Sequence, residues 1–141
     1  MINVFVYGTL KPGEENYSQY CADKVIDTKP AFAMGKLYAL PQGYPAMTLG
    51  NNPVWGYMLS FPDSTVLVEL DQLEDYQPSR HSSENLYNRR YINIFIQDNT
   101  NITPKRPQRV GQVWAYLMEE SLIEQLGGTL QVDGLWSGCK N

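Results

Sequence analysis

Hydrophobic and polar residues are arranged in short runs along most of the chain, as in a protein built mainly of β-strands. Residues 2–7 are apolar, β-branched or aromatic except for Asn3, which is typical of a buried strand. Further strands are predicted at residues 30–40, 46–49, 54–61, 91–96 and 111–118, separated by segments rich in Gly, Pro and Asn.

Three segments predict helices instead: residues 14–25, residues 65–76 and residues 119–126. The second follows Asp63 or Ser64, either of which can cap a helix. The third ends at Gly127-Gly128, and glycine commonly follows the last residue of a helix. Residues 77–85 and 98–108 are polar and rich in Pro, Ser and Asn, so they predict loops.

Strands outnumber helices and do not alternate regularly with them, which argues against a doubly wound sheet. The pattern predicts an α+β fold: a small mixed, mostly antiparallel β-barrel or strongly curved sheet with two or three flanking helices. The chain of 141 residues can bury a core without disulfides and contains no internal repeat or linker. We therefore expect a single domain over residues 1–141.

Composition and charge narrow the function classes. A net charge of −4 disfavours nucleic-acid binding, which needs a basic face. No apolar run approaches the ~20 residues of a membrane-spanning helix, and the chain begins directly in a strand, so we expect a cytoplasmic protein without a membrane partner. Cys21, Cys139 and the single histidine, His81, form no zinc or redox motif, and no nucleotide-binding motif is present. We expect no metal, no cofactor, and either a monomer or a homodimer.

The segment Tyr7-Gly8-Thr9-Leu10 directly follows the first predicted strand. At Gly8 we expect a bend with a backbone conformation that residues with side chains disfavour, and Lys11-Pro12-Gly13 predicts a second turn. A strand that ends in this way presents successive backbone N–H groups, which can bind an anion or an oxyanion. The alternative is an ordinary tight turn with no ligand.

The helix predicted at residues 65–76 has an apolar face with one carboxylate near its centre. At about 100° per residue, that face is formed by Val66, Leu67, Leu70 and Leu73. Glu74 lies about 40° from its middle, whereas Asp71 and Asp75 lie roughly 100° or more away. Burial would raise the pKa of Glu74 toward neutrality, where a carboxyl group moves protons at physiological pH. The alternative is that Glu74 turns to water at a frayed helix end.

These two segments resemble the γ-glutamylcyclotransferase-like family, which includes γ-glutamylamine cyclotransferases and AIG2-like proteins. The run from Val4 to Gly13 resembles the opening signature of the family, and Leu70-Asp71-Gln72-Leu73-Glu74 is similar to its Leu-Asp-x-x-Glu element. The resemblance implies the family's fold, a catalytic acid/base role for Glu74, and a substrate-binding role for Tyr7, Gly8, Thr9, Leu10 and Tyr116. The family usually has Gly after this Glu, whereas this chain has Asp75.

Weaker matches lie elsewhere in the chain. Tyr87-Asn88-Arg89 resembles a Tyr-x-Arg element of the family, and Arg89 either anchors a substrate carboxylate or pairs with Glu74 or Asp75; we expect the pairing. Residues 43–46 resemble a loop at the mouth of the family's pocket, and residues 134–138 a Gly-polar-Trp element near its C-terminus.

The resemblance implies an enzyme that converts a small γ-glutamyl amine or γ-glutamyl amino acid to 5-oxoproline. The substrate's own α-amine attacks the γ-carbonyl, with Glu74 as general acid/base and no cofactor. The alternative function is a non-catalytic module that uses the same pocket to bind a small carboxylate or a protein partner.

Overall fold

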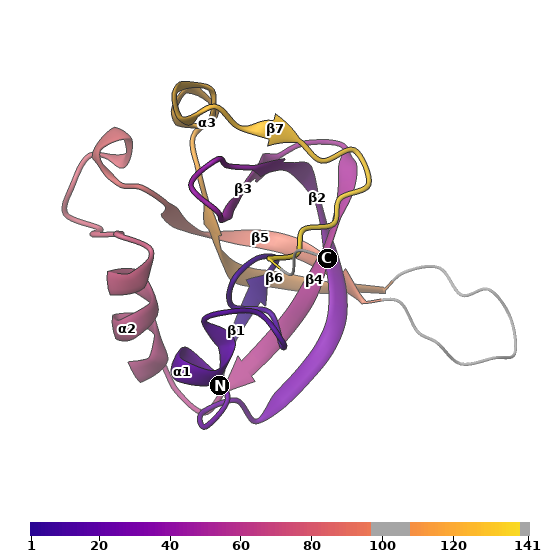
Figure 1. The fold of residues 1–141 in the computed structure, drawn as a ribbon. Coiled ribbons are helices and arrows are strands. Elements are labelled where there is room, and N and C mark those ends of the chain that lie inside the picture. Colours follow the sequence, from indigo (N-terminus) through magenta and orange to yellow (C-terminus); the bar gives the residue numbers. More distant parts are fainter. Residues whose placement is uncertain (97–107, 139–141) are drawn as a thin grey trace, which may run out of the picture.

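The computed structural model describes residues 1–96 and 108–138 (Figure 1). The helices are α1 (Tyr17–Tyr20), α2 (Thr65–Leu73), α3 (Glu120–Leu126) and the 3₁₀ turn η1 (Ser82–Glu84). The strands are β1 (Ile2–Val6), β2 (Asp27–Ala39), β3 (Pro45–Leu49), β4 (Asn52–Phe61), β5 (Asn88–Ile96), β6 (Gln108–Leu117) and β7 (Thr129–Leu130).

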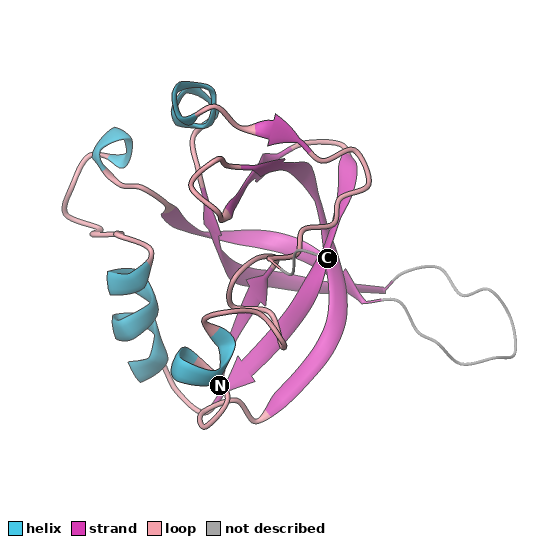
Figure 2. Ribbon diagram, viewed as in Figure 1, coloured by secondary structure: helices cyan, strands magenta, loops and turns pink. Residues whose placement is uncertain are grey.

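Five strands close into a barrel in the order β2-β4-β1-β6-β5, with β5 returning to β2 (Figure 2). β1 and β6 are parallel, and the other neighbours are antiparallel. The closing contact is short: Phe32 faces Phe95, and their stacked rings have centroids 5.2 Å apart. β3 and β7 extend the sheet from β2. The predicted fold class, a mixed and mostly antiparallel barrel with flanking helices, is therefore confirmed.

β1 is buried on both faces, which explains its nearly continuous apolar sequence. Val4 and Val6 belong to a cluster that includes Leu70 of α2, whereas Phe5 belongs to a second cluster that includes Ile94 of β5. Successive residues of a strand point to opposite sides. β1 thus packs against the interior of the barrel on one side and against the layer beneath α2 on the other. The candidate site begins directly after its last residue, Val6.

Two predicted helices are shorter in the structure, and one short strand was not predicted. The helix predicted at residues 14–25 is wrong in length: only Tyr17–Tyr20 is helical, and its neighbours form turns. α2 ends at Leu73 instead of Tyr76, because Asp75 adopts a φ of 52°, outside the right-handed helical region. β7 has only two residues and was not predicted.

The other outcomes concern single residues. The predicted end of α3 is confirmed, since Gly127 adopts a left-handed conformation with φ of 82°. His81 is exposed, and its Nδ1 accepts a hydrogen bond from the Ser83 N–H at the start of η1. Cys21 is a buried free thiol, whereas Cys139 and all but the last residue of the predicted loop 98–108 lie outside the described residues. No described helix has the length and apolarity needed to cross a bilayer.

Candidate functional site

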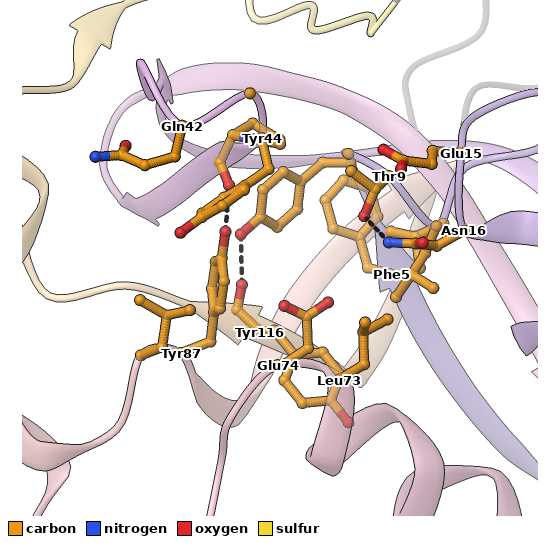
Figure 3. Close-up of a pocket in the computed structure, with 17 residues that line it drawn as sticks. Phe5, Thr9, Glu15, Asn16, Gln42, Tyr44, Leu73, Glu74, Tyr87 and Tyr116 are labelled. Atoms are coloured by element: carbon orange, nitrogen blue, oxygen red, sulfur yellow. Dashed lines mark hydrogen bonds between the residues drawn. The ribbon is translucent and has the colours of Figure 1, made fainter. Parts of the chain in front are cut away.

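A cavity of about 270 Å³ opens where the chain leaves β1 and the C-terminal end of α2 approaches the barrel (Figure 3). Four parts of the chain line it: β1 with the loop that follows, the loop before β3, the end of α2 with the segment before β5, and β6. The lining residues are Phe5, Val6, Tyr7, Gly8, Thr9, Leu10, Glu15, Asn16, Gln42, Gly43, Tyr44, Pro45, Leu73, Glu74, Leu86, Tyr87 and Tyr116. All six residues predicted to form the site are among them.

The loop after β1 lines this cavity with Tyr7, Gly8, Thr9 and Leu10. Its carbonyl groups are engaged, since the Lys11 N–H donates to the Gly8 carbonyl at 3.0 Å and the Asn16 N–H to the Thr9 carbonyl at 2.8 Å. Within the described part of the chain, no acceptor binds the N–H groups of Gly8, Thr9 or Leu10. Successive N–H groups of this kind form a site for a carboxylate or a developing oxyanion.

Gly8 is required for a different reason than predicted. The expected unusual backbone conformation is wrong, because Gly8 is not among the residues with positive φ. A Cβ atom at this position would instead lie 2.5 Å from Cγ and 2.9 Å from Cδ of Pro45. Only glycine allows the loop to approach the Pro45 ring, which itself lines the cavity.

Glu74 is the residue immediately after α2, and its backbone continues the helical hydrogen bonding, with its N–H donating to the Leu70 carbonyl at 2.9 Å. The predicted orientation therefore holds although the helix is shorter than expected. The half-buried Glu74 carboxylate points into the cavity (Figure 3). It has neither a hydrogen-bond donor nor an ion-pair partner among the described residues. Burial raises the pKa of Glu74 to about 7.

The cation that was expected beside Glu74 is engaged elsewhere. Arg89 pairs with Asp71, with 3.2 Å between its Nε and the Asp71 Oδ1, and its guanidinium lies 4.5 Å from the centre of the Trp114 ring. The predicted pairing of Arg89 with Glu74 or Asp75 is therefore wrong in its partner. Asp75 instead pairs with Arg80, at 3.2 Å. These pairings leave the Glu74 carboxylate without a neutralising cation.

Asp71 connects α2 to the barrel wall. Its Oδ1 accepts a hydrogen bond from the Tyr116 hydroxyl at 2.7 Å, so the Tyr116 side chain extends beneath Glu74 toward α2 (Figure 3). The Glu74 carbonyl also accepts a hydrogen bond from the Tyr87 N–H at 3.3 Å. β6 and the segment before β5 thus fix the end of α2, and with it the position of the carboxylate.

Sequence reasoning did not select Tyr87 or Glu15 as site residues, although both line the cavity. Tyr87 was noted only as part of the Tyr-x-Arg match, and it lies in a polar segment before β5. Glu15 lies in a turn within the segment that was predicted to be helical. Because a turn has no regular repeat of side-chain directions, the sequence pattern gave no signal that Glu15 faces the cavity. Burial raises the pKa of both Tyr7 and Tyr87, which keeps their hydroxyl groups protonated.

Substitution of Glu74 by Gln is expected to stabilise the fold at alkaline pH. The pKa of Glu74 is raised from 4.5 to about 7, so the folded protein retains this proton when the unfolded chain has lost it. Ionisation therefore lowers the free energy of unfolding as pH rises from 4.5 to about 7. At 1.36 kcal/mol per pKa unit, this amounts to about 3 kcal/mol above pH 7, a cost that Gln avoids.

Urea unfolding of both proteins at pH 4.5 and pH 8.5 measures this effect. The Glu74→Gln protein should gain stability over the wild type only at the higher pH. A difference between the two proteins that is the same at both pH values would show that the carboxylate is not desolvated in the folded state.

The sequence matches the family described as "Gamma-glutamyl cyclotransferase, AIG2-like" over residues 4–138. Over 76 residues it is 37% identical to the γ-L-glutamyl-butirosin B γ-glutamyl cyclotransferase of Niallia circulans, an alignment that covers 54% of this chain and 47% of that protein. The chain spans about half the length of the curated relatives that it matches.

Solved structures share the fold. An AIG2-like protein from Mus musculus superposes with a TM-score of 0.65 at 21% identity, covering 97% of this chain and 88% of that one. YkqA from Bacillus subtilis gives a TM-score of 0.61 at 20% identity, covering 96% of this chain but 39% of its own. The family match runs from β1 through the cavity to the C-terminal segment, and this protein therefore belongs to the γ-glutamyl cyclotransferase, AIG2-like family.

Proposed function

We propose that this protein converts a γ-glutamyl amine or γ-glutamyl amino acid to 5-oxoproline and the free amine. One observation carries the proposal: the unpaired Glu74 carboxylate points into a cavity that Gly8, Thr9 and Leu10 also line, and no acceptor among the described residues binds their N–H groups. An unpaired carboxylate in a partly desolvated cavity lowers the stability of the fold. Such a group is therefore a candidate for a catalytic or binding role. The family membership of the chain and the activity named for its Niallia circulans relative support the same reaction.

The reaction needs one new bond and the loss of one old bond, and no water is consumed. The α-amine nitrogen of the substrate attacks its γ-carbonyl carbon and closes a five-membered lactam, while the bond to the departing nitrogen breaks. Glu74 takes the proton that the α-amine must lose and delivers a proton to the departing nitrogen. The N–H groups of Gly8, Thr9 and Leu10 hold the developing oxyanion or the glutamyl carboxylate.

Incubation of the purified protein with a panel of γ-glutamyl compounds tests this function. Chromatography should detect 5-oxoproline and the free amine in equal amounts. Saturable ligand binding without any product would instead identify a non-catalytic binding module.

The rim of the cavity favours a departing amine that carries an additional positive charge. The exposed lining residues are Glu15, Gln42 and Gly43, and Glu15 is the only charged one among them. No Lys, Arg or His lines the cavity among the described residues. A carboxylate on the leaving group would therefore be repelled by Glu15 and Glu74, whereas an ammonium group would be attracted.

The panel should accordingly include a γ-glutamyl diamine and a γ-glutamyl amino acid of similar length. We expect a higher kcat/KM for the diamine, by about two- to fivefold for an exposed charge, and a smaller preference at high salt. Glu15→Lys should reverse the preference, and Glu15→Gln should reduce it. A preference that does not change in the Glu15→Lys protein would exclude Glu15 as its source.

A further inference from the structure

Two buried tyrosines, Tyr7 and Tyr87, form one wall of the cavity. Each uses its only hydroxyl hydrogen in a hydrogen bond within the protein. The Tyr7 hydroxyl donates to the Tyr116 carbonyl at 2.5 Å, and the Tyr87 hydroxyl donates to the Pro45 carbonyl at 2.6 Å (Figure 3). A phenol has a single hydrogen to donate and two lone pairs to accept with. Toward a ligand, these oxygens can therefore act only as acceptors.

The acceptor character of this wall is fixed by its surroundings. Both partners are backbone carbonyls, which cannot donate in return, and Tyr7 and Tyr87 are 6% and 5% exposed. Glu74 adds a carboxylate close enough to both phenols to interact with them electrostatically. The cavity thus has a set of acceptors from Tyr7, Glu74 and Tyr87, and a separate set of backbone donors in the loop after β1.

The separate acceptor and donor sets of the cavity are complementary to a zwitterionic glutamyl group. Its ammonium group can only donate hydrogen bonds, and its carboxylate can only accept them. A carboxylate or oxyanion at the tyrosine wall would meet only other acceptors, so it belongs on the N–H groups of Gly8, Thr9 and Leu10. An ammonium group has three N–H donors and no acceptor, so it belongs on the opposite set.

We propose that the Tyr87 hydroxyl oxygen, with that of Tyr7, binds the α-ammonium group of the substrate beside Glu74. The assignment rests on the proposed function and specifies which atom of the substrate faces the carboxylate. It makes Tyr87 the residue that orients the nucleophile, so that Glu74 receives a proton from the α-amine and not from water or the leaving group.

Binding of a matched pair of unreactive analogues tests this assignment. The first is a γ-glutamyl amine in which a CH₂ group replaces the γ-carbonyl, and the second is the same molecule without its α-amine. Calorimetry on the wild type, Tyr87→Phe and Tyr91→Phe gives the two dissociation constants for each protein. Tyr91 is the matched control, because it lies four residues further on in β5, is 53% exposed, and can keep its stacking on Trp114 as Phe.

We expect Tyr87→Phe to weaken binding of the α-amino analogue by about tenfold or more, the size for a hydrogen bond to a charged group. Binding of the des-amino analogue should change less than about twofold, which also shows that the Pro45 side of the cavity is intact. Equal losses for both analogues, or no loss for either, would overturn the assignment. Tyr7→Phe provides a second test, in which a selective loss of the α-amino analogue is again expected.

The experiment separates this inference from the proposed function. Suppose that the wild type forms no 5-oxoproline but Tyr87→Phe selectively weakens binding of the α-amino analogue. The ammonium site is then supported, and the cyclisation is contradicted. If 5-oxoproline is formed but Tyr87→Phe binds both analogues as the wild type does, the cyclisation is supported and the ammonium site is contradicted.

Discussion

Glu74→Gln is expected to lower kcat for 5-oxoproline formation by about 10²- to 10⁴-fold, the usual contribution of a positioned general acid/base. Gln has nearly the same shape as Glu but cannot accept the proton of the α-amine. The substrate contacts of the loop after β1 remain, so KM should change much less than kcat. Steady-state assays of 5-oxoproline release by the purified proteins measure both constants.

Asp75→Asn is the matched control for this substitution. It removes one carboxylate at the next residue, outside the set that lines the cavity, and Asn tolerates the left-handed conformation found there. Its kcat should stay within about twofold of the wild-type value, since the ion pair with Arg80 is exposed. Comparable losses in the two proteins would mean that the effect comes from charge near the helix end and not from Glu74 itself.

The dependence of activity on pH follows from the same carboxylate. Proton uptake requires the ionised form of Glu74, so kcat/KM should rise as pH increases through about 7, the pKa to which burial raises this group. The residual activity of Glu74→Gln should lack this rise. A wild-type rise centred near pH 4.5 would instead indicate a solvated carboxylate.

Gly8→Ala is expected to raise KM by about tenfold or more. The added Cβ would lie 2.5 Å from Cγ of Pro45, so either the loop or the start of β3 must move. Overpacking of this kind typically costs about 1–3 kcal/mol. Movement of the loop would misdirect the N–H groups of Gly8, Thr9 and Leu10, and movement of Pro45 would shift the acceptor of the Tyr87 hydroxyl.

A double substitution shows whether this steric contact is the cause. Pro45→Ala removes the Cγ and Cδ atoms that the new Cβ would meet, while the carbonyl that binds Tyr87 is kept. Gly8→Ala combined with Pro45→Ala should therefore recover part of the lost kcat/KM relative to Gly8→Ala alone. Additive losses in the double variant would contradict the steric explanation and point to the backbone of the loop itself.

The strands of the barrel could be predicted from the sequence because they are buried, and burial requires recognisable runs of apolar residues. β1 and the centres of β4 and β6 are apolar runs whose composition alone fixes their conformation. α1 was predicted too long because Tyr17, Cys21 and Val25 recur every four residues, a spacing that consecutive turns can also give. β7 depends on pairing with β2 at Tyr38 and Ala39, a tertiary contact that leaves no local pattern.

The site was predictable only where one element determines a residue's direction. Helical periodicity was enough to place Glu74, because its backbone continues the hydrogen bonding of α2. The partner of Arg89 could not be chosen from the sequence, since Asp71, Glu74 and Asp75 all lie within one turn of each other. The acceptor wall of Tyr7 and Tyr87 depends on carbonyls of Tyr116 and Pro45, which are distant in sequence.

The most direct test of the cyclisation is the fate of oxygen when the wild-type protein consumes a γ-glutamyl diamine in ¹⁸O-labelled water. Intramolecular attack by the α-amine predicts one 5-oxoproline for each amine released, with no ¹⁸O in the product. Labelled glutamate in its place would show that water is the nucleophile and would contradict the account.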